Sequence, residues 1–125
     1  MPELPEVQTV VNGIKSKLIG LKIKDTEVFV KKLRYPVPIN LKNKINKSSL
    51  IDVERRAKYI ILRLSNDYSL IIHLGMSGRI IIGKKKEIKS IKHTHFQLHF
   101  SNDLLLQFID PRRFGCILLR ETSKL

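Results

Sequence analysis

Cysteine, long apolar runs and acidic residues are all scarce in this chain of 125 residues. The single cysteine, Cys116, excludes an internal disulfide and favours a reducing setting, where we expect it to pack as a small apolar group. No apolar stretch approaches the ~20 residues that span a bilayer, and the first residues lack the basic segment and apolar core of a secretory signal. We therefore expect a cytoplasmic protein with no membrane partner.

The shortage of acidic residues leaves a large excess of positive charge. The 24 lysines and arginines outnumber the 11 aspartates and glutamates, which gives a formal net charge of +13. Such an excess attracts polyanions, and nucleic acid is the partner that it favours most. Membrane surfaces and acidic proteins are the alternatives, and lysine-rich chains also arise in genomes biased toward A and T. Hydrophobic residues make up 42% of the chain, enough for one folded domain with a buried core.

The first residues combine prolines and glutamates with an apolar pattern of helical spacing. Apolar side chains recur every three or four residues, which predicts the buried stripe of an amphipathic helix that ends near Gly20. Pro5 suits the first turn of such a helix, where the missing N–H costs no hydrogen bond. The stripe consists of Leu4, Val7, Val10, Val11, Ile14 and Leu18.

Pro2 makes this N-terminus chemically interesting. Because proline is small, we expect Met1 to be removed, which leaves a secondary amine as the first atom of the chain. An α-amino group titrates near ~7.7–8.0, so part of it is neutral at cellular pH and can attack a carbonyl-like carbon to form a Schiff base. Glu3 and Glu6 lie within a turn of this amine and could transfer protons. The alternative is a capped helix whose acidic residues only complement its dipole.

Beyond the helix, short apolar runs alternate with turn residues. Strands in such quick succession favour an α+β fold, an antiparallel β-sandwich with a long N-terminal helix and a short second helix over 41–45. The segment 34–40 holds two prolines and is expected to be irregular, and 84–87 is expected to be a solvated loop. The predicted strands are 21–30 with a turn near Asp25, 49–54, 58–64, 69–74, 79–82, 95–100, 104–110 and 116–120.

The loop 73–78, with the sequence HLGMSG, joins two of these strands. Its two glycines allow a tight turn that another part of the backbone can approach closely. Met76 then projects from the turn, flexible enough to fill an irregular void. The alternative is an ordinary β-turn with Met76 in the core.

The loop 110–115, with the sequence DPRRFG, is the second of this kind. Arg112 and Arg113 can make bidentate contacts to phosphates or base edges. Phe114 can wedge into a base stack, as apolar side chains do in opened duplexes, provided that it is exposed. A third basic turn, 55–58, ends at Lys58, and we expect it to contact phosphates or to lie in solvent.

Three histidines, His93, His95 and His99, share the parity of one strand face, which raises the question of a metal site. Residues six apart on a strand are separated by about 20 Å, so His93 and His99 cannot share an ion. His93 and His95 could share one but lack a further ligand. We therefore expect no metal, and phosphate contact is the better interpretation of His93 and His95.

Five segments together resemble bacterial formamidopyrimidine-DNA glycosylase in order and spacing, over essentially the whole chain. The related endonuclease VIII branch typically has glycine where Leu4 stands and lacks the LGMSG turn, so the resemblance is to the branch that acts on oxidised purines. The segments that carry it are 2–7 (PELPEV), 56–59 (RAKY), 73–78 (HLGMSG), 93–95 (His-Thr-His) and 110–115 (DPRRFG).

The resemblance implies a bifunctional repair enzyme that acts on damaged double-stranded DNA. It implies removal of 8-oxoguanine and ring-opened purines, followed by β- and δ-elimination that nicks the strand. Pro2 matches the family's nucleophile, which attacks the sugar C1′ and forms a Schiff base. Glu3 matches the acid that protonates the sugar ring oxygen and Glu6 the supporting carboxylate, while Lys58 matches the proton donor in β-elimination.

The resemblance also implies how the DNA is held. A base cannot be processed inside the stack, so it is flipped out at a cost of a few kcal/mol, and the hole must be refilled. His93 and Arg112 match the DNA-contacting positions of the family. Met76, Arg112 and Phe114 match the side chains that fill the gap left by the extruded nucleotide.

Part of the family pattern has no counterpart in these residues. The family's C-terminal half carries a helix–two-turn–helix element and a four-cysteine zinc finger, so we expect residues 1–125 to be the N-terminal catalytic domain, without a cofactor of its own. We expect a monomer, bacterial and associated with the nucleoid through DNA, that is impaired alone or completed by a separate C-terminal polypeptide. The alternatives are a non-catalytic basic DNA-binding fragment and an inert remnant.

Overall fold

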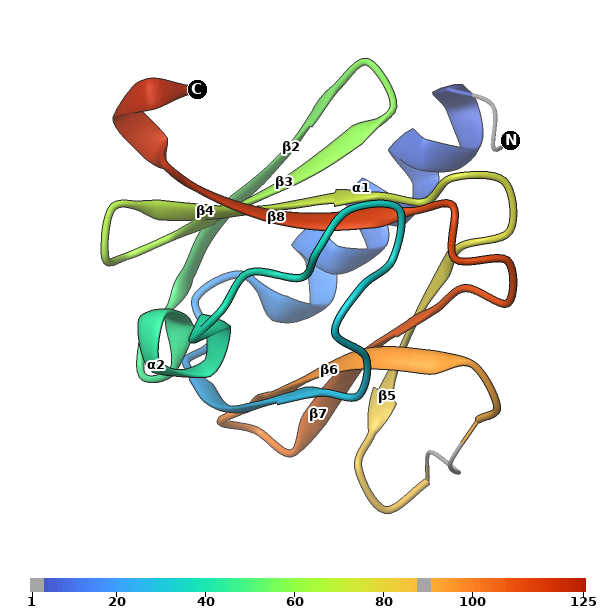
Figure 1. Cartoon of the computed structure of the whole chain (residues 1–125). Coiled ribbons are helices and arrows are strands. Elements are labelled where there is room, and N and C mark those ends of the chain that lie inside the picture. Colours follow the sequence, from blue (N-terminus) through green and yellow to red (C-terminus); the bar gives the residue numbers. More distant parts are fainter. Residues whose placement is uncertain (1–3, 88–90) are drawn as a thin grey trace.

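Two four-stranded antiparallel sheets form a sandwich in the computed structural model, which describes residues 4–87 and 91–125 (Figure 1). The strand orders are β1-β6-β7-β5 and β2-β3-β4-β8. The helices are α1 (Leu4–Leu18) and α2 (Leu41–Ile45), with a 3₁₀ turn η1 (Thr122–Lys124). The strands are β1 (Ile23–Val28), β2 (Leu50–Arg56), β3 (Tyr59–Leu64), β4 (Tyr68–His73), β5 (Arg79–Lys84), β6 (Thr94–Phe100), β7 (Leu104–Ile109) and β8 (Cys116–Glu121). The predicted α+β sandwich with one long and one short helix is confirmed.

Helix α1 ends where its apolar pattern predicts. Four of the six stripe residues are buried and pack the helix against β2 and β3. Leu4 is 42% exposed, so the buried face starts one turn later than predicted. Gly20 has a φ of 86°, which a residue without a Cβ adopts most readily, and its N–H donates to the Leu50 carbonyl at 2.7 Å. This bond directs the chain from α1 into β1.

The core lies between the two sheets. Phe96, Phe100 and Phe108 are fully buried and come from β6 and β7. They belong to one continuous cluster with apolar residues of β3 and β4, such as Leu62 and Ile72. Burying a side chain of this size stabilises the fold by roughly 1.5–3 kcal/mol. This core supports the loops at both ends of the sandwich.

Two irregularities in the first sheet correct the sequence predictions. The register of β1 against β6 shifts between Ile23 and Asp25, so the chain makes a bulge at Lys24 where a turn was expected. The register of β6 against β7 shifts between Thr94 and Phe96. This second bulge, at His95, breaks the alternation of side chains on which the histidine prediction depended.

The histidines therefore do not share one face. His93 precedes β6, is exposed and has a φ of 66°. His95 is only 3% exposed, whereas His99 points to the outer face of the sheet and pairs with Glu27 of β1. A period-two count along the sequence cannot anticipate a bulge, because the extra residue shifts the side chains that follow.

Strand boundaries otherwise lie within two residues of the predictions for most of the sandwich. Strand β5 continues to Lys84, so only Lys85 to Glu87 of the predicted basic loop form a turn among the described residues. The segment between β1 and α2 is irregular apart from one short bridge between Lys32 and Pro36, as its prolines predict. No helix of residues 4–87 and 91–125 is long and apolar enough to cross a membrane.

Candidate functional site

The loops that carry the predicted site residues gather at one end of the sandwich (Figure 1). This end, called here the loop end, holds the N-terminal end of α1, the β2–β3 turn, the β4–β5 loop, the β7–β8 loop and the start of β6. Glu6 lies exposed in the first turn of α1. The predictions for Pro2 and Glu3 concern residues outside the described ranges.

The β4–β5 loop has the close backbone approach that its glycines predict. Gly75 has a φ of 63°, and a Cβ at this position would lie 2.6 Å from the backbone nitrogen of Gly115. A Cβ on Gly78 would lie 2.2 Å from the carbonyl oxygen of Leu74. Met76 is 52% exposed at the tip of this turn, so the alternative that places it in the core is wrong.

The β7–β8 loop also presents an apolar side chain to solvent. Phe114 is 43% exposed, which satisfies the condition on which its interpretation as a wedge depends. The guanidinium carbon of Arg112 lies 4.9 Å from the centre of the Phe114 ring, in a cation–π arrangement. Arg113 is exposed and has a φ of 58°. The loop thus places two guanidiniums and a phenyl ring together on the surface.

Asp110 connects these two loops from inside the molecule. Its side chain is fully buried. The Ser77 hydroxyl donates to its Oδ1 at 2.7 Å, and the Gly115 N–H donates to its Oδ2 at 2.8 Å. Ser77 Oγ also accepts the N–H of Arg112 at 3.2 Å. One hydroxyl therefore bridges the loop of Met76 and the loop of Phe114.

The start of β6 is held by the same aspartate. The Asp110 N–H donates to the carbonyl of His93 at 3.1 Å. His95 Nε2 lies 2.7 Å from the carbonyl oxygen of Asp110, so this nitrogen carries the proton and donates it. The phosphate-contact interpretation is wrong for His95, because its ring is buried and occupied. His93 is exposed at this end, and its DNA contact stays a prediction.

The β2–β3 turn is tied to helix α1 through Arg55. Its Nε donates to Gln8 Oε1 at 3.0 Å, and its Nη1 donates to the Ala57 carbonyl at 3.0 Å. Lys58, half-buried, follows directly in the chain. The turn that carries Lys58 is therefore braced against the second turn of α1, the helix whose first turn holds Glu6.

His73 lies where the β2–β3 turn meets the β4–β5 loop. Its ring packs edge-on against Tyr59, with ring centres 4.8 Å apart, and its Nδ1 accepts the Gly75 N–H at 3.0 Å. Burial lowers the pKa of His73, and the positive charges of Arg34 and Lys58 lower it further. The neutral imidazole thus keeps its acceptor for Gly75 in the folded protein.

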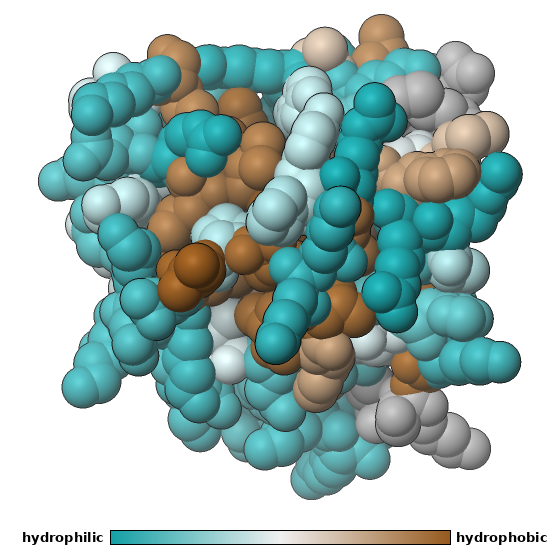
Figure 2. Space-filling model, in the orientation of Figure 1, coloured by the Kyte–Doolittle hydropathy of each residue, from teal (hydrophilic) through white to brown (hydrophobic). Residues whose placement is uncertain are grey.

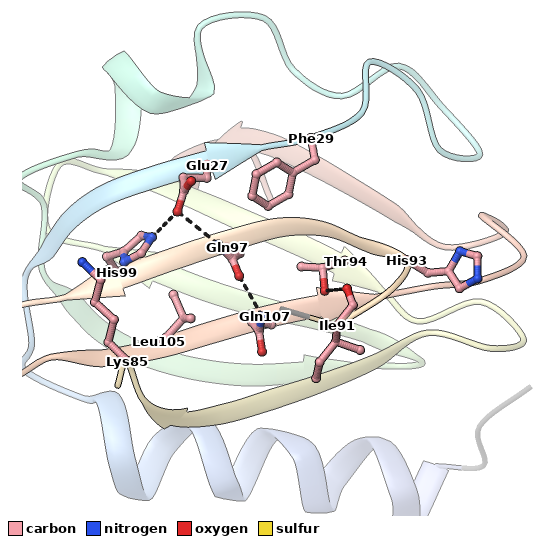
Figure 3. Close-up of a pocket in the computed structure, with 10 residues that line it drawn as sticks. All are labelled: Glu27, Phe29, Lys85, Ile91, His93, Thr94, Gln97, His99, Leu105 and Gln107. Carbon is pink, nitrogen blue, oxygen red and sulfur yellow. Dashed lines mark hydrogen bonds and ion pairs between the residues drawn. The ribbon is translucent and has the colours of Figure 1, made fainter. Parts of the chain in front are cut away.

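The outer face of the β1-β6-β7-β5 sheet carries a polar depression of about 420 Å³ beside the loop end (Figure 3). In Figure 3, Glu27 accepts hydrogen bonds from His99 and Gln97, and Gln97 in turn accepts one from Gln107. His93 lies at the rim. This network links strands of one sheet.

Two further features bear on metal and thiol chemistry. The described ranges hold no group of three histidine, cysteine or acidic side chains placed to bind a metal ion. Cys116 is buried, and this burial raises the pKa of its thiol, which makes it a poor nucleophile. It packs as a small apolar group, as predicted.

The surface between these features is mostly hydrophilic. Figure 2 shows hydrophilic side chains over most of one face, with hydrophobic surface gathered near its middle. A surface rich in cations attracts the phosphate backbone of nucleic acid over a range set by salt screening. Most lysines and arginines of the described residues are exposed, so the charge excess expected from composition lies on the exterior.

Sequence reasoning missed the residues that hold the site together. Asp110 belongs to a segment that was interpreted for its arginines and its phenylalanine, and Ser77 was passed over between two glycines. The available signal was the aspartate before a proline at the end of an apolar strand, a common start of a turn. That signal does not reveal a partner 33 residues away.

Comparisons with known proteins agree with this geometry. The family model described as the formamidopyrimidine-DNA glycosylase N-terminal domain matches residues 1–117. A formamidopyrimidine-DNA glycosylase of Rickettsia africae is 47% identical over 125 residues, which are 100% of this chain and 45% of that protein. The protein of the same name from Hahella chejuensis is 41% identical over 119 residues, 95% of this chain and 43% of its own length.

Solved structures give the same result. A crystal structure of the Lactococcus lactis glycosylase bound non-covalently to DNA with an AP site superposes with a TM-score of 0.90 at 30% identity, covering 99% of this chain and 47% of that chain. The same enzyme in complex with DNA that contains FAPY-dG gives a TM-score of 0.88 at 30% identity, covering 98% of this chain and 45% of that chain. The chain spans less than half the length of the curated relatives named here.

Proposed function

Because the chain belongs to the formamidopyrimidine-DNA glycosylase family, we propose that it carries the catalytic half of a DNA glycosylase that removes oxidised purines during base excision repair. The proposed substrate is double-stranded DNA with 8-oxoguanine or a ring-opened purine. Support comes from the Lactococcus lactis relatives, whose structures hold DNA with an AP site or with FAPY-dG. The excess of positive charge suits this polyanionic partner.

The observation that carries this proposal is the pair of exposed apolar side chains on two braced loops. Met76 and Phe114 lie half-exposed, and the loops that bear them touch at Gly75 and Gly115. Arg112 stacks on Phe114. A thioether, a guanidinium and a phenyl ring can together replace the stacking and pairing of an extruded nucleotide.

The chemistry that we propose begins at the N-terminus. With Met1 removed, the neutral amine of Pro2 attacks C1′ of the flipped nucleotide, the glycosidic bond breaks, and the damaged base leaves with the bonding electrons and takes up a proton. Glu3 protonates the sugar ring oxygen as the ring opens to the iminium, and Glu6 supports that acid. Loss of a C2′ proton then expels the 3′ phosphate, and a second elimination expels the 5′ phosphate.

The remaining residues have binding roles in this proposal. Lys58 holds a phosphate beside the reacting sugar and supplies a proton in the first elimination. His93 and Arg113 contact the backbone of the DNA, which positions the duplex without reading its sequence. The brace from Gln8 through Arg55 to the β2–β3 turn supports this geometry, because it fixes Lys58 relative to α1.

Borohydride trapping on an abasic-site duplex tests the proposal. Reduction of the Schiff base by borohydride is expected to give a covalent protein–DNA adduct with the parent chain and none with Pro2→Gly. Pro38→Gly, in the irregular segment before α2, is the matched control and is expected to trap like the parent. Mass spectrometry of the purified chain should show an unblocked terminus that starts at Pro2.

The alternative function is DNA binding without catalysis. It predicts no adduct at any protein concentration, together with salt-dependent binding of duplex DNA by a chain that melts cooperatively. Absence of a cooperative transition would instead indicate an inert remnant. These three outcomes are mutually exclusive.

A further inference from the structure

Asp110 is a buried carboxylate that the proposed chemistry does not use. It follows directly on β7 and is fully buried, although its neighbours in the chain from Pro111 to Phe114 are exposed. Burying a charged group is costly unless hydrogen bonds replace the lost water. A position with this cost calls for a physical reason.

The hydrogen bonds of Asp110 all lead to the loop end. One carboxylate oxygen accepts the Ser77 hydroxyl and the other accepts the Gly115 N–H. The carbonyl of Asp110 accepts both the Arg113 N–H, at 3.2 Å, and the His95 ring. One residue therefore fixes the β4–β5 loop, both arms of the β7–β8 loop and the start of β6.

The backbones of the two loops also pack closely against each other. A Cβ on Gly115 would lie 2.5 Å from the His73 carbonyl oxygen and 3.0 Å from Asp110 Oδ2. A Cβ on Gly75 would meet the backbone of Phe114 and Gly115 at 2.6 Å. Neither loop can shift by much without breaking contact with the other.

From this arrangement we propose that Asp110 is a positioning residue that joins the two loops into one rigid unit, so that Met76, Arg112 and Phe114 enter the duplex together. The proposal rests on the proposed function, since it assigns the role of these loops during base extrusion. A loop that is already ordered loses less conformational entropy when it inserts its side chains. Asp110 thereby acts through other residues and touches no reacting atom.

The test compares two DNA substrates that differ in whether a stack must be opened. One is a duplex with paired 8-oxoguanine, from which excision is measured. The other is a single-stranded abasic oligonucleotide, on which borohydride trapping needs no base extrusion. The quantity compared between variants is the ratio of the two rates, which a general loss of folded protein leaves unchanged.

Asp110→Asn is the first variant. It keeps the shape and one acceptor oxygen. Its NH₂ group faces either the backbone N–H of Gly115 or, if the amide flips, the hydroxyl of Ser77, so that one of the two hydrogen bonds to the carboxylate is lost. We expect the rate ratio to fall about tenfold, as the loss of one hydrogen bond to a charged group predicts. The matched control is Asp103→Asn, the same change at the opposite end of β7 in an exposed turn, and its ratio is expected to equal that of the parent.

A second pair of variants keeps the proposal testable should Asp110→Asn fail to fold. Ser77→Ala removes the bridging hydroxyl at a partly exposed position, and we expect it to lower the ratio about three- to tenfold. Ser77→Thr retains the hydroxyl and should restore the ratio. Equal reduction by both Ser77 variants would point to general loop damage and overturn the proposal.

A binding readout separates this proposal from the function on which it rests. With 2-aminopurine beside an abasic site in a duplex, the bound parent chain is expected to raise the emission as the stack opens, and Asp110→Asn to raise it less at saturation. Identical emission and an unchanged rate ratio would overturn the positioning role. Failure of the proposed function would look different, because the parent chain itself would then trap no DNA.

Discussion

Strand β7 has an aspartate beside each end, and the two residues differ in burial and in the role of the side chain. Asp103, before the strand, is exposed in a turn and is held through its backbone, whose N–H donates to the Phe100 carbonyl at 3.1 Å and whose carbonyl accepts the Lys85 N–H at 2.8 Å. Asp110, after the strand, is buried, and its carboxylate accepts a hydroxyl from a loop 33 residues away. The same residue type therefore makes a turn at one end and a tertiary lock at the other.

The turns of the two ends are also held in different ways. Turns of the far end, around the start of β1 and α2, expose polar side chains such as Asn66 and Asn102, which also satisfy nearby backbone N–H groups. The loop end exposes Met76 and Phe114, which gain nothing from water. The two loops that carry these side chains are held from elsewhere in the fold, by the carboxylate of Asp110 and by the close approach of Gly75 to Gly115.

The largest loss of stability is expected when a single methyl group is added at the loop end. Gly75→Ala should lower the free energy of unfolding by ~3 kcal/mol, because it adds strain at a positive φ to a clash with backbone. Gly20→Ala is the control at the other end of α1, where φ is also positive but no atom lies within 4 Å, and it should cost about 1 kcal/mol. Urea denaturation gives both values, and equal costs would contradict the role of close packing at Gly75.

A smaller effect is expected when the exposed ring is removed without disturbing its loop. Phe114→Ala should leave binding to an abasic-site duplex largely intact but slow excision of paired 8-oxoguanine about tenfold, equivalent to ~1.4 kcal/mol. Phe29→Ala truncates a ring at the polar depression that is exposed at least as much, 52% against 43%, and should change neither. Single-turnover excision assays on both variants measure the difference, and parent-like rates for Phe114→Ala would refute the wedge.

The pH dependence of stability should differ between the two ends. At the loop end it is expected to depend on His73. The folded-state pKa of His73 is lowered, so on acidification the unfolded chain takes up a proton near its ordinary value of ~6.5 while the folded imidazole resists it. The contribution of His73 to the free energy of unfolding is therefore complete above pH ~6.5 and is lost as the pH falls below that value. His73→Gln should flatten this part of the profile, as measured by urea denaturation at several pH values between 5 and 8.

The smallest effect belongs to the far end, where Asp25 pairs with Lys42 at 2.9 Å. A hydrogen bond from Lys42, and then one from the Thr26 backbone, lower the pKa of Asp25 from 3.8 to about 2. The stabilisation is present above pH 3.8 and is lost as the pH falls toward 2. Because the pair is exposed, we expect Asp25→Asn to cost less than ~1 kcal/mol at pH 7, and the difference from the parent to vanish near pH 2.

Local patterns predicted the elements of the fold well. The apolar spacing from Val7 to Leu18 is a property of one helix, and Gly20 supplies the positive φ that ends it, so α1 could be predicted within a residue. The turns before Tyr68 and Leu104 follow from asparagine side chains that accept the backbone N–H of the residue two positions later. The exposure of Phe114 was the condition on which its interpretation depended, and for Met76 the local sequence left both the exposed and the core position open; the structure exposes both side chains.

Local patterns failed where a distant strand decides the geometry. Nothing near His95 in the sequence indicates a bulge, because the bulge is a relation between β6 and β7. The turn expected near Asp25 is likewise a bulge against β6. The brace from Gln8 to Arg55 joins residues 47 apart, and helical periodicity says nothing of it.

The sequence by itself determined the helix, the approximate strands, the basic surface and the order of the family's motifs, because each depends on residues close in the chain or on composition alone. Only the tertiary structure decided the pairing of the strands in two sheets, the inward turn of His95 and the meeting of Ser77 with Asp110. Those contacts join segments whose separation in the chain carries no signal, and they form only when burial of the core brings the segments together.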